Sequence, residues 1–231
     1  MKNIWRSLFI LVSVILLWNQ IVFRPFRVLS IFFHKIGHAL TAFLFGYGYL
    51  AFRVTFGGMG DTILYAKGWF ASFMISNGGY IGSLLFAVIV LYLRKTPARK
   101  FLLGSISILY LTISISYPAL RGTLIYSVIF TSFVIVLYMI QKETINEWII
   151  DIIGITTIAY IIYDTFVNTI LLKLNQQLFI IKGWRSSPPD DIIRLSNLTH
   201  LPTLVWGIIW LVISVFVLNA VLLKASKSKK R

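Results

Sequence analysis

Apolar stretches of nearly bilayer length, separated by short basic or glycine-containing connections, constrain the fold of this chain more than any other feature. A helix needs about 20 predominantly apolar residues to cross the hydrocarbon core of a membrane. Only 13% of the residues are charged, whereas soluble proteins carry about 25%. The sequence therefore predicts an all-α polytopic membrane protein, with residues 1–231 forming a single integral membrane domain.

Seven transmembrane helices are expected from the positions of the apolar stretches. They cover residues 8–23, 28–45, 69–93, 101–117, 123–140, 148–172 and 204–223. An odd number of spans places the two termini on opposite sides of the membrane. Cytoplasmic loops carry an excess of Lys and Arg, so the basic connection at 94–100 and the basic tail at 224–231 indicate a cytoplasmic C-terminus and an external N-terminus.

Two connections have predicted structure of their own. Residues 46–68 combine aromatic and β-branched residues with a glycine-rich break, which indicates a short β-like hairpin or extended loop that offers its backbone to an extended peptide. An ordinary connecting loop fits the pattern equally well. Before the last span, Ser187-Pro188-Pro189-Asp190-Asp191 is typical of a helix start, so we expect an interfacial helix that ends near Thr199.

The net charge of +15 does not indicate nucleic acid, because the basic residues are divided among loops and a tail between the spans. This distribution favours anionic lipid headgroups as the partner of the basic residues. The chain has no cysteine, which excludes disulfides and thiolate metal sites.

His34 and His38 lie four residues apart inside the second span, so a helix presents both imidazoles on one face. This is the arrangement of a metal-binding pair, although packed and hydrogen-bonded histidines are the plainer interpretation. Catalytic zinc sites take at least three protein ligands. Asp164 is the only carboxylate deep within a span, and a rise of 1.5 Å per residue places it at about the depth of His38. The three side chains can therefore meet near the same depth in the membrane. The alternative is that Asp164 is a structural partner of Lys35 or of a tyrosine.

Lys35 stands where the metalloprotease motif His-Glu-x-x-His has its general base. A lysine ammonium has no acceptor for a proton. A neutral Lys35 acting as the base is one alternative, but its long side chain reaches the headgroup region more easily. No other carboxylate in the sequence obviously replaces the glutamate.

The sequence resembles the site-2 protease family of intramembrane zinc metallopeptidases, in its compact bacterial branch. Residues 33–40 are similar to the His-Glu-x-Gly-His-Ala helix of that family except at Lys35, and Gly79-Tyr80-Ile81-Gly82 resembles its Gly-Tyr-Leu-Gly. Gly57-Gly58 resembles the glycine pair of the family's substrate-binding loop. Tyr163-Asp164 falls where the family places its third zinc ligand, and residues 191–206 resemble its closing segment.

This resemblance implies zinc held by His34, His38 and Asp164, and hydrolysis of peptide bonds within the membrane. With Lys35 in place of the general base, we expect a catalytically impaired pseudoprotease that binds or regulates a membrane protein or transmembrane peptide. Two alternatives are an active intramembrane metalloprotease with a non-standard base and a metal-free membrane protein such as a small transporter.

Overall fold

The computed structural model describes residues 2–46, 48, 67–117, 121–179, 181 and 187–227. All of the elements formed by these residues are helices, which confirms the all-α prediction. The elements are α1 (Lys2–Leu17), the 3₁₀ turn η1 (Ile21–Phe23), α2 (Arg24–Phe45), α4 (Trp69–Leu93), α5 (Arg99–Ser116), α6 (Arg121–Ile140), α7 (Glu143–Thr165), the π-helix η4 (Phe166–Leu171), α8 (Leu172–Leu178), α9 (Asp190–Thr199) and α10 (Thr203–Lys227).

Within the described part of the chain, six helices are long and apolar enough to cross a membrane. They lie at Ile21–Phe45, Trp69–Leu93, Arg99–Ser116, Gly122–Ile140, Glu143–Leu178 and Thr203–Leu223. The expected first span at 8–23 is different, because its apolar helix covers only Trp5–Leu17 and then breaks before η1. Among the described residues, six of the seven expected spans therefore meet this criterion of length and hydropathy.

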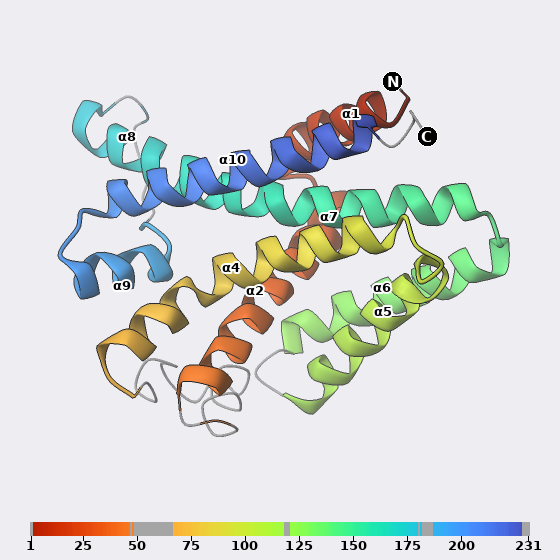
Figure 1. The fold of residues 1–231 in the computed structure, drawn as a ribbon, viewed down its shortest axis with the longest axis horizontal. Coiled ribbons are helices and arrows are strands. Elements are labelled where there is room, and N and C mark those ends of the chain that lie inside the picture. The colour runs from red at the N-terminus through yellow and green to blue at the C-terminus, as the bar shows by residue number, and fades with distance from the viewer. Residues whose placement is uncertain are drawn as a thin grey trace.

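The placement of the termini on opposite sides depended on that count. Six complete crossings return a chain to the side on which it started. In Figure 1 the beginning of α1 and the end of α10 lie at the same end of the molecule, and these two helices contact each other. The predicted external N-terminus and cytoplasmic C-terminus are not supported by this arrangement.

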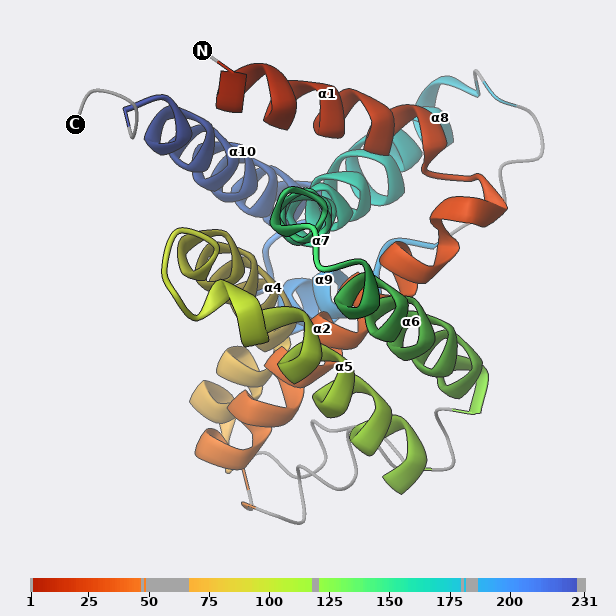
Figure 2. The ribbon, with the colours of Figure 1, turned by 90° about the vertical axis from the view of Figure 1, so that its right-hand side faces the viewer.

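Helix α7 occupies the middle of the bundle. Figure 2 looks nearly along its axis and shows α1, α10, α4, α2 and α6 arranged around it. Helix α7 contacts α1, α2, α4, α5 and α10. Its central position explains why polar side chains on an otherwise apolar helix, including Asp151, Thr156, Thr157 and Asp164, are buried inside the protein. Helices α5 and α6 form a pair at one side (Figure 1).

Helices α2 and α4 approach each other so closely that only glycine fits between them. A Cβ atom on Gly37 would lie 2.3 Å from the carbonyl oxygen of Gly78, and one on Gly82 would lie 2.3 Å from the Cα atom of Gly37. Small residues allow such an approach of helix backbones in membranes. This contact fixes the position of the α2 histidines relative to α4.

The structure describes one of the two connections for which local structure was predicted, but very little of the other. A helix does precede the last span and ends at Thr199 as expected, since α9 covers Asp190–Thr199 with Pro189 at its N-cap. The expected β-like loop at 46–68 lies almost wholly outside the described residues.

The α2–α4 contact gives a test of the fold. We expect Gly37→Ala to lower the thermal stability of the purified protein in detergent, because the new methyl group meets backbone atoms that have no side-chain freedom. Overpacking of this kind costs about 1–3 kcal/mol, so the melting temperature should fall by several degrees. Gly122→Ala is the matched control, since its added Cβ meets nothing within 4 Å. Equal melting temperatures for the two variants would contradict the close contact.

Candidate metal centre

Helix α2 brings His34 and His38 together one turn apart, as their spacing predicts. The two Nε2 atoms lie 3.2 Å from each other. His34 is buried, with 6% of its surface exposed. The rings meet edge to face, with centroids 4.8 Å apart. Both imidazoles therefore direct the same nitrogen toward one point inside the bundle.

Asp191, in the first turn of α9, is the carboxylate that meets this pair. Its Oδ2 atom lies 2.8 Å from Nε2 of His34 and 3.1 Å from Nε2 of His38. Among the described residues, His34, His38 and Asp191 are the only His, Cys, Asp and Glu side chains that gather closely enough to hold a metal ion. The centre thus joins α2 to α9, because Asp191 lies 157 positions after His34 and 153 positions after His38 in the chain.

Packing and tryptophan hydrogen bonds hold α9 in position. Ile192 and Leu195 are fully buried in the cluster formed with α4, α7 and α10. Trp69 donates its indole N–H to the carbonyl oxygen of Leu198 at 2.8 Å, and Trp206 donates to Oγ1 of Thr199 at 2.9 Å. These contacts attach α9 to the beginnings of α4 and α10, so that Asp191 faces the histidines.

The hydrogen bond on the other side of His38 determines which of its nitrogens carries a proton. Nδ1 of His38 lies 2.8 Å from the carbonyl oxygen of Ile75, which only accepts hydrogen bonds. Nδ1 must therefore be the donor, and in the neutral ring Nε2 presents a lone pair. That lone pair faces a carboxylate oxygen. An arrangement of electron-rich atoms around one point requires a cation there, either a proton or a metal ion.

Gly79 of α4 leaves open the space next to these atoms. A Cβ atom at this position would lie 2.3 Å from Nε2 of His34 and 2.4 Å from Nε2 of His38. Any other residue would thus place a methyl or larger group against both nitrogens. Gly79 thus provides the clearance on which the centre depends.

The donor set and its spacing fit zinc. Zinc binds imidazole nitrogen and carboxylate oxygen at about 2.0–2.2 Å, and tetrahedral geometry then separates the ligand atoms by roughly 3.3 Å. The three ligand atoms here are 2.8, 3.1 and 3.2 Å apart. Three protein ligands with one position left over are typical of catalytic rather than structural zinc sites.

The ionisation of Asp191 also suits a metal ligand. Burial by itself disfavours the charged form of this carboxyl group. With a proton on each Nε2 atom, the charge of His38 and the hydrogen bonds from His34 and His38 outweigh burial, and together they hold the pKa of Asp191 well below its usual range. The carboxylate is therefore the form present at neutral pH.

Asp164, the third ligand expected from the sequence, is not part of this cluster. Its Oδ2 atom accepts a hydrogen bond from the hydroxyl group of Tyr80 at 3.0 Å, and Oδ1 accepts one from the side-chain amide of Asn168 at 3.1 Å. Agreement in depth between two helices does not determine which way a side chain faces. Here the carboxylate of Asp164 bonds to Tyr80, whose ring lies edge-on to His34 with centroids 5.0 Å apart. The contact agrees with the alternative in which Asp164 is a structural partner of a tyrosine.

Asp164 still lies within electrostatic range of His34 and Asp191. It is followed almost at once by the π-helix Phe166–Leu171, where the side chain of Thr169 donates to the carbonyl oxygen of Asp164 at 3.1 Å. Single π turns inside α-helices are frequent at functional sites. Asp164 therefore belongs to the surroundings of the centre, behind Tyr80.

Lys35 and the glycine pair complete the list of expected site residues. Lys35 is partly buried on α2, and it makes no ion pair with a residue that the structure describes. Gly57 and Gly58, expected to bind substrate, lie outside the described residues.

Asp191 was visible in the sequence as the acid that opens the closing segment, but it was assigned to a helix start. Acidic residues are common in the first turn of any helix, so this position alone does not indicate a ligand. The signal that could have identified Asp191 was its position in residues 191–206, which resemble the closing segment of a zinc-binding family. The folding of α9 against α4 and α10, which brings the acid to α2, has no local signature.

A protein-family model matches most of the chain. No curated protein and no solved structure matches it in these comparisons. The family model described as Peptidase M50B-like matches residues 7–221, which include both histidines and Asp191. This match confirms the resemblance to site-2 proteases, and the chain belongs to the Peptidase M50B-like family of membrane metallopeptidases.

Proposed function

We propose that this protein is a zinc-binding scaffold of the site-2 protease type that lacks peptidase activity and acts by binding another membrane protein. The observation that supports zinc binding is the convergence of His34, His38 and Asp191 within 3.2 Å of one another. When bound, zinc would supply Lewis-acid polarisation of a carbonyl group. The observation that supports inactivity is Lys35.

Hydrolysis of a peptide needs a group that takes a proton from water and later delivers it to the leaving amine. The ammonium group of Lys35 offers three donors and no acceptor. A glutamate at this position performs both transfers in the His-Glu-x-x-His motif. The substitution thus removes the proton carrier while leaving both histidines in place.

Five of the six carboxylates in the described part of the chain already have polar partners. Asp191 contacts the two imidazoles, and Asp164 accepts hydrogen bonds at both oxygens. Asp151 is paired with Arg6 and Arg94. Glu143 and Glu147 form ion pairs with Arg99. None of these acids replaces the missing base without giving up an existing partner.

A second candidate is an active protease that uses Asp164 as its base, which is favoured by the electrostatic proximity of Asp164 to His34. This function requires the Tyr80 hydrogen bond to Asp164 to break during turnover. The two candidates differ in their predicted activity, because only the second one predicts proteolysis by the unmodified protein.

Zinc content tests the ligand set. We expect Asp191→Asn and His34→Ala to lose zinc, with an affinity loss of at least about 100-fold, since even indirect partners of zinc ligands contribute about 10–100-fold. Asp164→Asn and Asp190→Asn should retain the zinc of the unmodified protein. Asp190 is the matched control, because it is the exposed neighbour of Asp191 on the same helix turn.

The measurement is metal analysis of purified protein after dialysis, with size-exclusion profiles to show that each variant is folded. Loss of zinc from Asp164→Asn but not from Asp191→Asn would contradict the proposed ligands. Absence of zinc from the unmodified protein, even after it is supplied, would favour the metal-free alternative.

Restoring the acid tests the proposed inactivity. We expect Lys35→Glu to cleave a transmembrane reporter in a chelator-sensitive way, at a rate at least about 100-fold above the unmodified protein, which is the lower range of general acid–base contributions. Lys35→Gln is the control, because it removes the positive charge without providing a base. Chelator-sensitive cleavage by the unmodified protein, abolished by Asp164→Asn, would instead establish the second candidate.

A further inference from the structure

A cavity of about 280 Å³ lies away from the metal centre, between α1, α4, α7 and α10. Most of its lining is apolar, and Val88 and Ile89 of α4 and Val221 of α10 contribute to it. Val88 and Ile89 are 39% and 52% exposed, so the cavity is open toward the outside of the bundle on this side. The surroundings of such an outward apolar face in a membrane protein are lipid chains.

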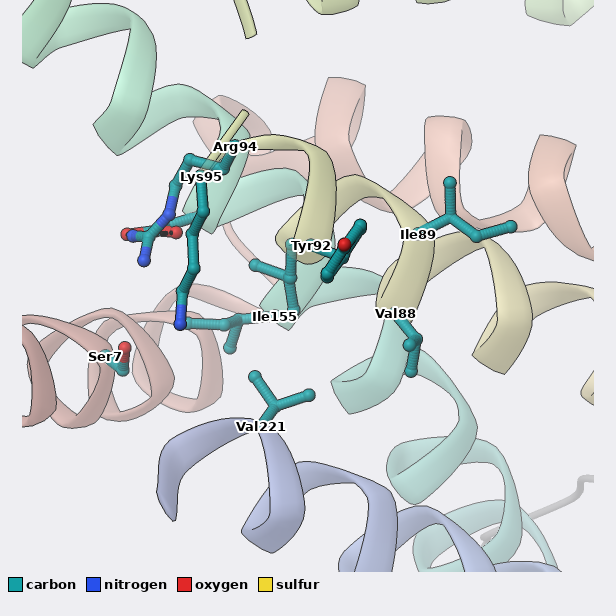
Figure 3. A pocket seen from close by; sticks show the side chains of 10 residues that line it. Ser7, Val88, Ile89, Tyr92, Arg94, Lys95, Ile155 and Val221 are labelled. Carbon is teal, nitrogen blue, oxygen red and sulfur yellow. Dashed lines mark hydrogen bonds and ion pairs between the residues drawn. The ribbon is translucent and has the colours of Figure 1, made fainter. Parts of the chain in front are cut away.

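One end of the same cavity is basic. Arg94 and Lys95, at the end of α4, line it together with Asp151 of α7 and Ser7 of α1. Figure 3 shows Lys95 extending from this end toward Ser7 and Ile155, with Val221 between Lys95 and Val88, while Val88 and Ile89 lie at the other end. The cavity is thus amphipathic along its length.

The basic end carries more positive than negative charge. Asp151 is 1% exposed and is shared by Arg94 and Arg6, the latter at 2.6 Å. Among the groups that line this end, Arg94 and Lys95 are basic and Asp151 is acidic, so positive charges outnumber negative charges by one.

This end of the molecule is also where the connection at 94–98, the α6–α7 connection and the beginning of α1 come together (Figure 1). Clusters of Lys and Arg in short connections are typical of the cytoplasmic side of a membrane. Anionic lipids are enriched in that leaflet, and basic pockets between transmembrane helices bind their headgroups.

We propose that this cavity binds one anionic phospholipid, with its phosphate group at Arg94 and Lys95 and an acyl chain along Val88, Ile89 and Val221. The apolar and basic ends match the two parts of such a lipid, and the excess positive charge matches its anionic headgroup. The bound lipid connects α1, the short helix that does not span a membrane by itself, to α4, α7 and α10. This inference does not depend on zinc or on proteolysis.

Native mass spectrometry of the full chain tests the proposal. The protein is released from detergent in the presence of equal amounts of dioleoyl-phosphatidylglycerol and dioleoyl-phosphatidylcholine. We expect one phosphatidylglycerol to be retained at least about tenfold in preference to phosphatidylcholine, because each basic residue near the surface adds to the affinity for anionic lipid. Inorganic phosphate alone should not compete at millimolar concentration, since it lacks the acyl chain.

Lys95→Glu should abolish this preference, whereas Lys100→Glu should keep it within about twofold. The two variants change charge equally in the same basic segment, but Lys100 does not line the cavity. Val221→Trp, which fills part of the cavity with an apolar side chain, should reduce retention without changing any charge. Melting temperatures show that each variant is folded. Equal retention of both lipids, equal effects of the two lysine variants or full competition by phosphate would overturn the proposal.

Discussion

The close contact between α2 and α4 is the constraint on which the candidate metal centre depends. Gly37, Gly78 and Gly82 allow the two backbones to touch, because any Cβ atom there would overlap its neighbour. At the same level Gly79 leaves space beside the Nε2 atoms of His34 and His38, and the carbonyl oxygen of Ile75 accepts the Nδ1 proton of His38. A single helix therefore provides close packing, clearance and ring orientation within little more than two turns. In a bilayer, where apolar surface gains nothing from burial against another helix, such packing is a main source of helix association.

Helix α9 completes the centre from the opposite end of the sequence. Its buried Ile192 and Leu195 attach it to the bundle, and the indole groups of Trp69 and Trp206 bind its last turn. As a result Asp191 reaches imidazoles that lie more than 150 positions earlier in the chain. The other deep acid, Asp164, is held by Tyr80 and Asn168 beside the π-helix. The protein thus contains two buried aspartates near the same histidine, one in direct contact with it and one behind a tyrosine.

Lys35 changes what this geometry means for chemistry. The family model that the chain matches is described as peptidase-like, and His34, His38 and Asp191 lie close enough together to hold a metal ion. In the function proposed above, Lys35, a cation with no acceptor, stands where a proton carrier is needed. At the basic end of the cavity between α1, α4, α7 and α10, Arg6 and Arg94 share the buried Asp151. Positive charge therefore occurs in two settings, at Lys35 on α2 and at the ion pairs of Arg6 and Arg94 with Asp151.

The sequence by itself determined the helical membrane class, the His34–His38 pair, the anomaly at Lys35 and the family, because hydropathy and i, i+4 spacing are local properties. It also indicated a helix ending at Thr199, where the structure has α9. Three features required the tertiary structure. Whether residues 8–23 span a membrane depended on the break after Leu17. Which of Asp164 and Asp191 contacts the two histidines depended on side-chain direction, which depth along a helix does not fix, and on how α9 folds back onto α4. The cavity beside Arg94 arises only where four helices from distant parts of the chain meet.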